Sequence, residues 1–220
     1  MPGPPGTAIA VFAKAPLAGH VKTRLADALS PSESARFHRV CTHATWERLQ
    51  ELRALDAFLF CDRPWAEFEA LCGTGRFRLQ RGADLGERMR HCLDDLLAEG
   101  YRRALIVGSD APTLPLAQVR EAVSALDWVD AAVGPSDDGG FTLIGASRTA
   151  PEMFRGVRWS VPDTRRACLR ALKSAGLRAT RLQVTAYDVD TSADLVRLRR
   201  DPALPVRLRR WFDAADRGPS

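Results

Sequence analysis

Short apolar runs alternate along the chain with longer stretches that have helical periodicity. The short runs predict buried strands over residues 8–13, 57–61, 104–107, 131–133, 141–144 and 180–184. The periodic stretches predict helices over residues 31–52, 84–99, 116–126 and 162–175, and further helices close the chain. This alternation favours an α/β fold with a mostly parallel sheet covered by helices on both faces.

Residues at the expected helix ends support these boundaries. Ser30 and Glu33 flank Pro31 in the pattern of a capping box, which starts a helix. Thr191 and Asp194 form a second pattern of the same kind, so we expect them to have a structural role. Gly176 follows another periodic stretch and is suited to end it.

Length and composition fit one globular domain. The 220 residues predict a single domain over residues 1–220, with its core at about residues 8–200. No apolar run approaches the roughly 20 residues that cross a bilayer, so we expect no membrane partner. Residues 1–7 lack a basic segment of the signal-peptide type. We therefore expect a cytoplasmic protein.

The remaining composition narrows the chemistry. Five scattered cysteines without a CxxC pair predict reduced, buried thiols, and four histidines lack the spacing of common zinc sites. The net charge is +5, and much of the excess lies near the carboxyl end, at Arg197, Arg199, Arg200, Arg207, Arg209 and Arg210. These arginines alternate with Leu and Val at helical spacing, which favours a solvated helix face over a nucleic-acid surface. A basic surface also suits an anionic small substrate.

Three segments follow expected strands and are candidates for a binding site. In open parallel sheets, ligands bind outside the carboxyl ends of the strands. That rule selects residues 14–24, 108–110 and 188–190.

The first segment is a basic loop that carries Lys14, Gly19, Lys22 and Arg24. A glycine lets backbone N–H groups approach an anion, lysine supplies a point charge, and arginine supplies a two-pronged donor. We therefore expect a phosphate-binding loop, and the alternative is a solvated basic loop. The spacing differs from that of a P-loop.

The other two segments end in carboxylates. Asp110 follows a buried strand between Gly108 and Pro112, where it could hold a hard cation such as Mg²⁺ or Mn²⁺. Asp188 and Asp190 lie on one side of an extended segment, and Asp190 is expected to face the strand ends. For an isolated Asp110, a turn or helix-cap role is the alternative.

Two further segments are weaker candidates. Asp138 precedes Gly139 and Gly140, a pattern of close approach between backbone and substrate, with a simple hairpin as an equal alternative. Gly82 and Arg88 flank an expected helix start, which itself attracts anions.

Taken together, the segments KAPLAGHVKTRL, QRGADLGERM, GSDAPTL, GPSDDGGFTLIG and DVDTSADL resemble the DUF2064 family of small transferases, which includes glycosyltransferase-like and arsenosugar-biosynthesis or radical-SAM/selenodomain-associated members. The resemblance covers about residues 8–200. It implies a GT-A fold of the nucleotide-diphospho-sugar transferase type, and it extends to small nucleotidyltransferases. It also implies that Asp110 and, through its DTxxDL pattern, Asp190 bind the metal that bridges nucleotide phosphates.

The chain departs from the family pattern in three places. Ala18 stands in the first loop where a proline is common, Phe141 and Thr142 replace an aromatic pair, and Val161 replaces a threonine after Trp159. The first change affects loop rigidity. The other two fall on expected acceptor contacts and leave the expected metal site untouched.

These observations predict a metal-dependent transferase that uses a nucleotide sugar as donor and glycosylates a small-molecule acceptor. Asp110 and Asp190 would hold Mg²⁺ or Mn²⁺, while Lys14, Lys22 and Arg24, with Arg88, would neutralise the donor phosphates. Asp110, Asp138 and Arg24 are the expected catalytic residues, with Asp138 near the acceptor or the donor sugar and as a candidate base. One alternative is a nucleotidyltransferase that joins a nucleoside triphosphate to a phosphorylated acid and releases pyrophosphate. Another is a non-catalytic nucleotide-binding module.

Overall fold

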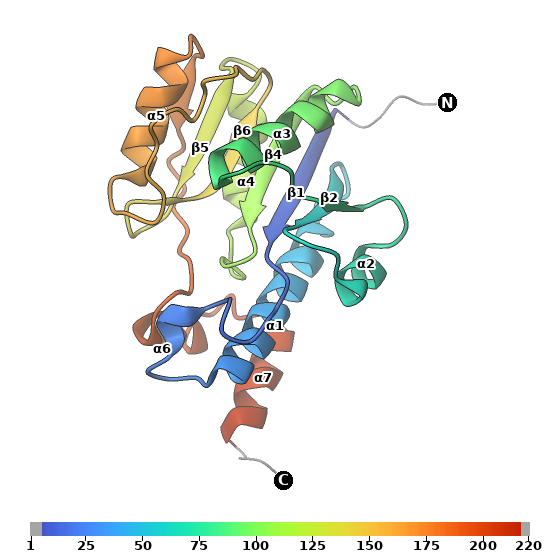
Figure 1. The fold of residues 1–220 in the computed structure, drawn as a ribbon, viewed down its shortest axis with the longest axis vertical. Coiled ribbons are helices and arrows are strands. Elements are labelled where there is room, and N and C mark those ends of the chain that lie inside the picture. Colours follow the sequence, from blue (N-terminus) through green and yellow to red (C-terminus); the bar gives the residue numbers. More distant parts are fainter. Residues whose placement is uncertain (1–5, 217–220) are drawn as a thin grey trace.

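The computed structural model describes residues 6–216 and contains one seven-stranded sheet in the order β3-β2-β1-β4-β6-β5-β7 (Figure 1). Neighbouring strands are parallel except for β6, which runs antiparallel to both β4 and β5. The strands are β1 (Thr7–Ala13), β2 (Asp56–Cys61), β3 (Phe77–Leu79), β4 (Arg103–Gly108), β5 (Ala131–Pro135), β6 (Phe141–Ala146) and β7 (Ala179–Arg181). The predicted α/β class with a mostly parallel sheet is confirmed.

Helices connect the strands and cover both faces of the sheet. They are α1 (Pro31–Leu49), α2 (Ala66–Cys72), α3 (Leu85–Ala98), α4 (Leu116–Ala125), α5 (Thr164–Ser174), α6 (Ser192–Arg199) and α7 (Val206–Asp216), with a short 3-10 turn η1 (Thr23–Leu25) before α1. Both predicted capping boxes are confirmed: Ser30 and Glu33 start α1, and Thr191 and Asp194 start α6.

The side chains of β1 illustrate how the two faces are formed. Ile9 and Val11 point to one face, where they pack with residues of α1, α2 and α4. Ala8 and Ala10 point to the other face, where they pack with residues of α3 and α5. Because successive side chains of a strand alternate between faces, a strand buried on both sides is apolar throughout.

A third apolar cluster lies beyond the edge of the sheet. Leu25 of the loop after β1 packs there with Val189 and with apolar residues of α1, α6 and α7. In Figure 1, α7 lies alongside α1, and the loop after β1 lies next to α6. The carboxyl-terminal helices therefore hold the basic loop in place.

Several sequence-based details need correction. The helix α2 and the strand β3 were not expected, the predicted strand over residues 180–184 is instead Ala179–Arg181, and α1 ends at Leu49.

The five cysteines are buried and unpaired, as predicted. Among the described residues, no helix is long and apolar enough to cross a membrane. Of the amino-terminal segment used to predict localisation, residues 1–5 lie outside the described part of the chain.

The hairpin between β5 and β6 gives a stability prediction. Gly139 has a φ of 91°, and a Cβ placed there would lie 2.0 Å from the carbonyl oxygen of Pro162. Gly176 has a φ of 75° but open space around it. We expect Gly176→Ala to lower the free energy of unfolding by about 1–2 kcal/mol, from backbone strain alone. Gly139→Ala should lower it by more, as measured by denaturant unfolding. Equal losses in the two variants would contradict the close approach at Pro162.

Candidate functional site

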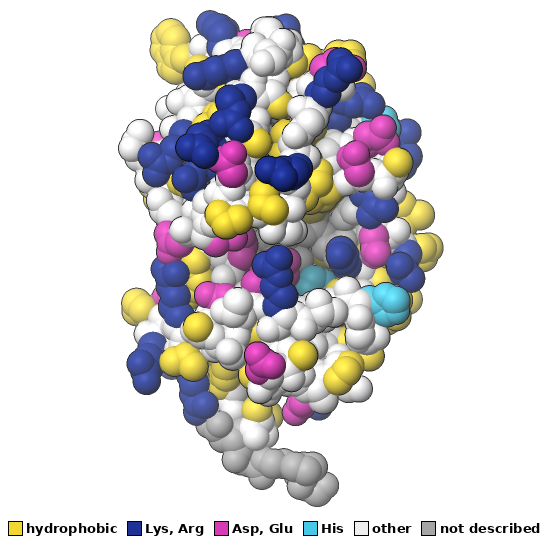
Figure 2. Space-filling model, turned by 60° about the vertical axis from the view of Figure 1, so that its left-hand side comes forward, with side chains coloured by type: hydrophobic (Ala, Val, Ile, Leu, Met, Phe, Trp, Pro, Cys, Tyr) yellow, Lys and Arg dark blue, Asp and Glu magenta, His cyan; other side chains and the backbone are white. Residues whose placement is uncertain are grey.

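A cleft of about 670 Å³ opens at the carboxyl ends of the parallel strands. Seven of the nine predicted site residues line it: Lys14, Lys22, Arg24, Arg88, Asp110, Asp138 and Asp190. Gly19 and Gly82 are not among the lining residues. Figure 2 shows a hollow in the surface with basic and acidic side chains at its rim. The residues selected by the strand-end rule are thus brought together in one place.

The loop after β1 is folded by local turns. His20 N donates to the carbonyl of Leu17, and Gly19 between them has a φ of 79°, so its role is to form the turn. Lys22 also has a left-handed backbone, with a φ of 51°. For a residue with a side chain, such a backbone costs on the order of 1–3 kcal/mol. Lys14 and Arg24 have exposed side chains on this loop.

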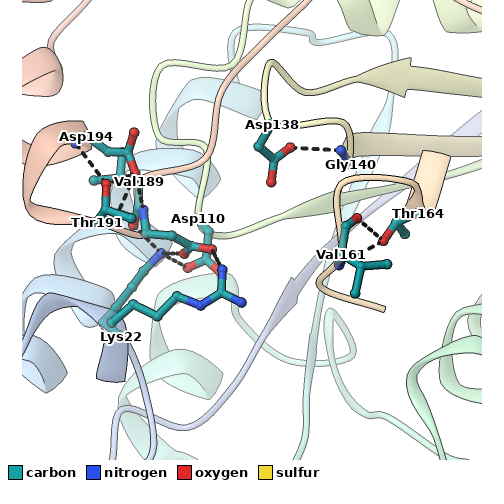
Figure 3. Close-up of polar contacts among 11 residues, drawn as sticks. Lys22, Asp110, Asp138, Gly140, Val161, Thr164, Val189, Thr191 and Asp194 are labelled. Carbon is teal, nitrogen blue, oxygen red and sulfur yellow. Dashed lines mark hydrogen bonds and ion pairs between the residues drawn. The ribbon is translucent and has the colours of Figure 1, made fainter. Parts of the chain in front are cut away.

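Lys22 borders the cleft, but its side chain is almost fully buried there, and only 2% of it is exposed. Its Nζ lies 2.7 Å from Asp110 Oδ1 and 3.0 Å from Asp190 Oδ1, and it donates to the carbonyl of Val189 at 2.7 Å (Figure 3). Asp110 follows β4, and Asp190 precedes α6. The ammonium therefore joins the basic loop to both predicted metal ligands.

Lys22 and Asp110 each shift the pKa of the other. Burial alone would lower the pKa of Lys22, but the carboxylates of Asp110 and Asp190 raise it above its usual value. Burial alone would raise the pKa of Asp110, but Lys22 and His38 hold it well below its usual range. Both groups therefore stay charged at neutral pH.

Asp188 lies beside this group and also lines the cleft. Burial, together with the charges of Asp110 and Asp190, raises the pKa of Asp188 to about 8. The carboxyl is mostly protonated at pH 7 as a result. Asp188 and Asp190 line the same cleft, which agrees with their predicted placement on one side of an extended segment.

His38 on α1 is a site residue that the sequence analysis missed. Its Nε2 is 2.9 Å from the carbonyl oxygen of Lys14, and its Nδ1 is 3.4 Å from Asp110 Oδ1. The side chain is almost fully buried between the basic loop and β4. It lies inside a helix with no nearby motif, so only the tertiary structure reveals it.

The start of α3 forms another side of the cleft. Asp84 caps the helix by accepting from Glu87 N, and Arg88 Nε donates to the carbonyl of Gly82. Gly82 thus positions Arg88 and does not itself line the cleft. Gln80, the first residue of the QRGADLGERM segment, donates through Nε2 to the carbonyls of Ala13 and Phe60. These two hydrogen bonds connect the ends of β1 and β2 beside the cleft.

The opposite wall comes from the β5–β6 hairpin and the segment before α5. Asp138 Oδ1 accepts from Gly140 N at 2.8 Å, so the hairpin role expected as an alternative is present (Figure 3). Asp138 also lines the cleft. Because β6 is antiparallel, its first residue, Phe141, lies at this same edge of the sheet and contacts Trp159 edge to face. This wall carries two aromatic side chains, those of Phe141 and Trp159.

Whether the donor set fits a divalent metal can be judged from the two carboxylates. Asp110 Oδ1 is buried against Lys22, yet 42% of the side chain is exposed, so Oδ2 faces the cleft. Asp190 Oδ2 has a long contact of 3.8 Å to Arg24, and 40% of that side chain is exposed. Within residues 6–216, no group of three or more His, Cys, Asp or Glu side chains is placed to hold a metal. One oxygen from each of two carboxylates fits Mg²⁺ or Mn²⁺ whose other ligands are substrate phosphates and water.

Comparison with known proteins places this chain among transferases. The chain is 33% identical, over 96% of its length and 97% of the other chain, to a protein from Desulfovibrio desulfuricans G20 that is provisionally named a nucleotide-diphospho-sugar transferase, with a TM-score of 0.78. It is 28% identical over 178 residues to phosphoenolpyruvate guanylyltransferase from Sphaerobacter thermophilus, covering 80% of this chain and 86% of that one.

A more distant structure shows the fold alone. CMP:2-keto-3-deoxy-manno-octonic acid synthetase in complex with CTP is 14% identical, covers 88% of this chain and 96% of its own, and has a TM-score of 0.57. The protein is an enzyme of the transferase type, similar to nucleotidyltransferases and nucleotide-sugar transferases. The expectation of an enzyme is confirmed, and the alternative of a non-catalytic nucleotide-binding module is wrong.

The family model described as an uncharacterized protein conserved in bacteria, DUF2064, matches residues 45–161, which is more than half of the chain. This match includes the start of α3, Asp110 and Asp138, while the basic loop and Asp190 lie outside it. The predicted resemblance is confirmed, and the chain belongs to the DUF2064 family.

Proposed function

We propose that the protein is a metal-dependent nucleotidyltransferase. It would join the α-phosphate of a nucleoside triphosphate to an oxygen of a small phosphorylated acid and release pyrophosphate. The carrying observation is that two half-exposed carboxylates and three cations, Lys14, Arg24 and Arg88, line one cleft. The relative that transfers a guanylyl group to phosphoenolpyruvate, matched over most of both chains, supports this route over the glycosyl route favoured from the sequence.

In this proposal, the cations bind the triphosphate. Lys14 and Arg24 approach from the loop after β1, and Arg88 approaches from α3. As the bond between the α-phosphorus and the bridging oxygen breaks, negative charge grows on the departing pyrophosphate, and fixed cations stabilise that charge. Asp110 and Asp190 would hold Mg²⁺ or Mn²⁺, which neutralises phosphate charge when bound.

The acceptor would bind against the opposite wall, near Asp138, Phe141 and Trp159. An acceptor phosphate or carboxylate oxygen is already negatively charged, so it can attack phosphorus without losing a proton to a base. In nucleotidyl transfer, Asp138 would therefore contact the acceptor and hold the hairpin turn, and a base role belongs to the glycosyl route, in which a hydroxyl attacks.

Glycosyl transfer from a nucleotide sugar is the second candidate. It is favoured by the match to the Desulfovibrio protein, which is more similar in sequence and covers nearly the whole chain. The aromatic wall of Phe141 and Trp159 also suits the apolar face of a sugar ring.

A product assay separates the two routes. The protein is incubated with Mn²⁺ and each common nucleoside triphosphate, with phosphoenolpyruvate and other phosphorylated small acids as acceptors. We expect acceptor-dependent release of pyrophosphate, and parallel incubations with nucleotide sugars should release little nucleoside diphosphate. The opposite pattern, nucleoside diphosphate from a nucleotide sugar and no pyrophosphate, would establish the second candidate instead.

The carboxylate pair gives a binding prediction. We expect Asp110→Asn and Asp190→Asn each to weaken Mn²⁺-dependent binding of a nucleoside triphosphate at least tenfold, because each variant loses one charged metal ligand. Asp137→Asn is the control, since Asp137 pairs with Arg197 and does not line the cleft. Calorimetry with and without Mn²⁺ measures the effect. Unchanged affinity in both site variants would rule out these two residues as metal ligands.

The cations give a second binding prediction. Removing a charge-assisted hydrogen bond costs about 1.5–3 kcal/mol, and Arg24 is largely exposed, so we expect a loss near the lower limit. Arg24→Ala should weaken binding of the triphosphate about tenfold and leave binding of the bare nucleoside unchanged. Arg155→Ala removes an arginine that pairs with Glu152 outside the cleft and serves as the control. Equal losses for triphosphate and nucleoside would indicate a folding defect.

A further inference from the structure

Lys22 is fully committed to oxygens of the protein itself. Its ammonium donates hydrogen bonds to Asp190 Oδ1 and to the Val189 carbonyl, and it forms an ion pair with Asp110 Oδ1 at 2.7 Å. Only 2% of the side chain is exposed, so these protein oxygens, and not a substrate phosphate, surround the ammonium. In this respect Lys22 differs from Lys14 and Arg24, which are exposed on the same loop.

The position of this ammonium affects how the carboxylates meet a metal ion. Each predicted metal ligand already contacts Lys22 through one oxygen, so a divalent cation at the remaining oxygens would sit close to a fixed positive charge. Like charges at short range repel strongly when they are shielded from water. A nucleotide polyphosphate can overcome this repulsion, because it brings negative charge and further oxygen ligands.

The loop cannot readily move to take Lys22 away. Leu25, three residues further on, is fully buried in the cluster formed with α1, α6 and α7. Val189, whose carbonyl accepts from Lys22, is buried in the same cluster, and its N–H donates to the carbonyl of Asp110. The loop that carries Lys22 and the segment that carries Val189 and Asp190 are therefore held by the same apolar cluster.

We propose that Lys22 is a positioning residue with two effects: it holds Asp110 and Asp190 together, and its charge prevents free divalent cations from binding to these two carboxylates. A metal ion then binds only together with nucleotide phosphates. The inference rests on the proposed function, because it needs a nucleotide and a metal at this cleft. It assigns Lys22 a role different from the phosphate contact expected from the sequence. Since coupling is reciprocal, the metal and the nucleotide raise each other's affinity by the same factor.

Binding of Mn²⁺ measured by electron paramagnetic resonance tests the proposal without any turnover. Wild-type protein alone should bind Mn²⁺ only weakly, and a non-hydrolysable nucleoside triphosphate analogue should tighten that binding at least tenfold. Lys22→Met keeps an unbranched side chain, one atom shorter than that of lysine, and removes its charge. This variant should bind Mn²⁺ without nucleotide at least tenfold more tightly than the wild type.

Two further variants serve as controls. Lys14→Met removes a charge from an exposed position on the same loop. This variant should bind nucleotide more weakly, and its affinity for Mn²⁺ in the absence of nucleotide should stay as low as that of the wild type. Lys22→Arg retains the positive charge and should also remain closed to Mn²⁺. Circular dichroism and thermal unfolding establish that each variant is folded.

The outcomes separate this proposal from the proposed function. Tight binding of Mn²⁺ to wild-type protein without nucleotide would overturn the role of Lys22, even if Lys22→Met fails to fold. A folded Lys22→Met variant that gains no affinity for Mn²⁺ would overturn it as well. If wild-type protein binds no nucleotide under any condition while Lys22→Met still gains Mn²⁺, the proposed function fails and the closing role of Lys22 stands.

Discussion

The rest of the site depends on the burial of one charged nitrogen. A buried ammonium is costly unless it is paired and hydrogen-bonded, so Lys22 can enter the interior only where Asp110, Asp190 and the Val189 carbonyl come together. These residues come from segments that are far apart in the chain: the loop after β1, the end of β4 and the start of α6. Forming the ion pairs therefore fixes the basic loop against the sheet. The left-handed backbone at Lys22 is strain that these contacts sustain.

Much of the fold and the location of the site follow from patterns that are local in sequence. Apolar runs such as the one in β1 report burial on both faces, and parallel strands carry their carboxyl ends to one edge. The strand-end rule therefore predicts that Lys14, Asp110 and Asp190 lie at one edge of the sheet, and all three line the cleft. The helix α2 was missed because its N-cap, Trp65, makes no side-chain cap hydrogen bond, and β3 because three residues show no periodicity.

Contacts between residues that are far apart in the chain could not be predicted in the same way. The spacing of the basic loop is the same whether Lys22 contacts a phosphate or the protein. Its actual partners, Asp110, Asp190 and the Val189 carbonyl, are far from it in the sequence. His38 carries no motif, and its proximity to Asp110 arises from the packing of α1. The raised pKa of Asp188 likewise depends on burial beside two other carboxylates.

The charge balance of the cleft connects these observations to the chemistry. Lys22 is offset by Asp110 and Asp190 within the protein, and Asp188 is mostly neutral at pH 7, so the cations facing outward are those of Lys14, Arg24 and Arg88. A triphosphate carries about as much negative charge as these three cations can offset, and the exposed oxygens of Asp110 and Asp190 add to it. Bringing the nucleotide next to the carboxylate pair thus leaves an excess of negative charge between them. A divalent cation would remove that excess, so in the proposed function the phosphates create the need for a metal that the positive charge of Lys22 disfavours in the free protein.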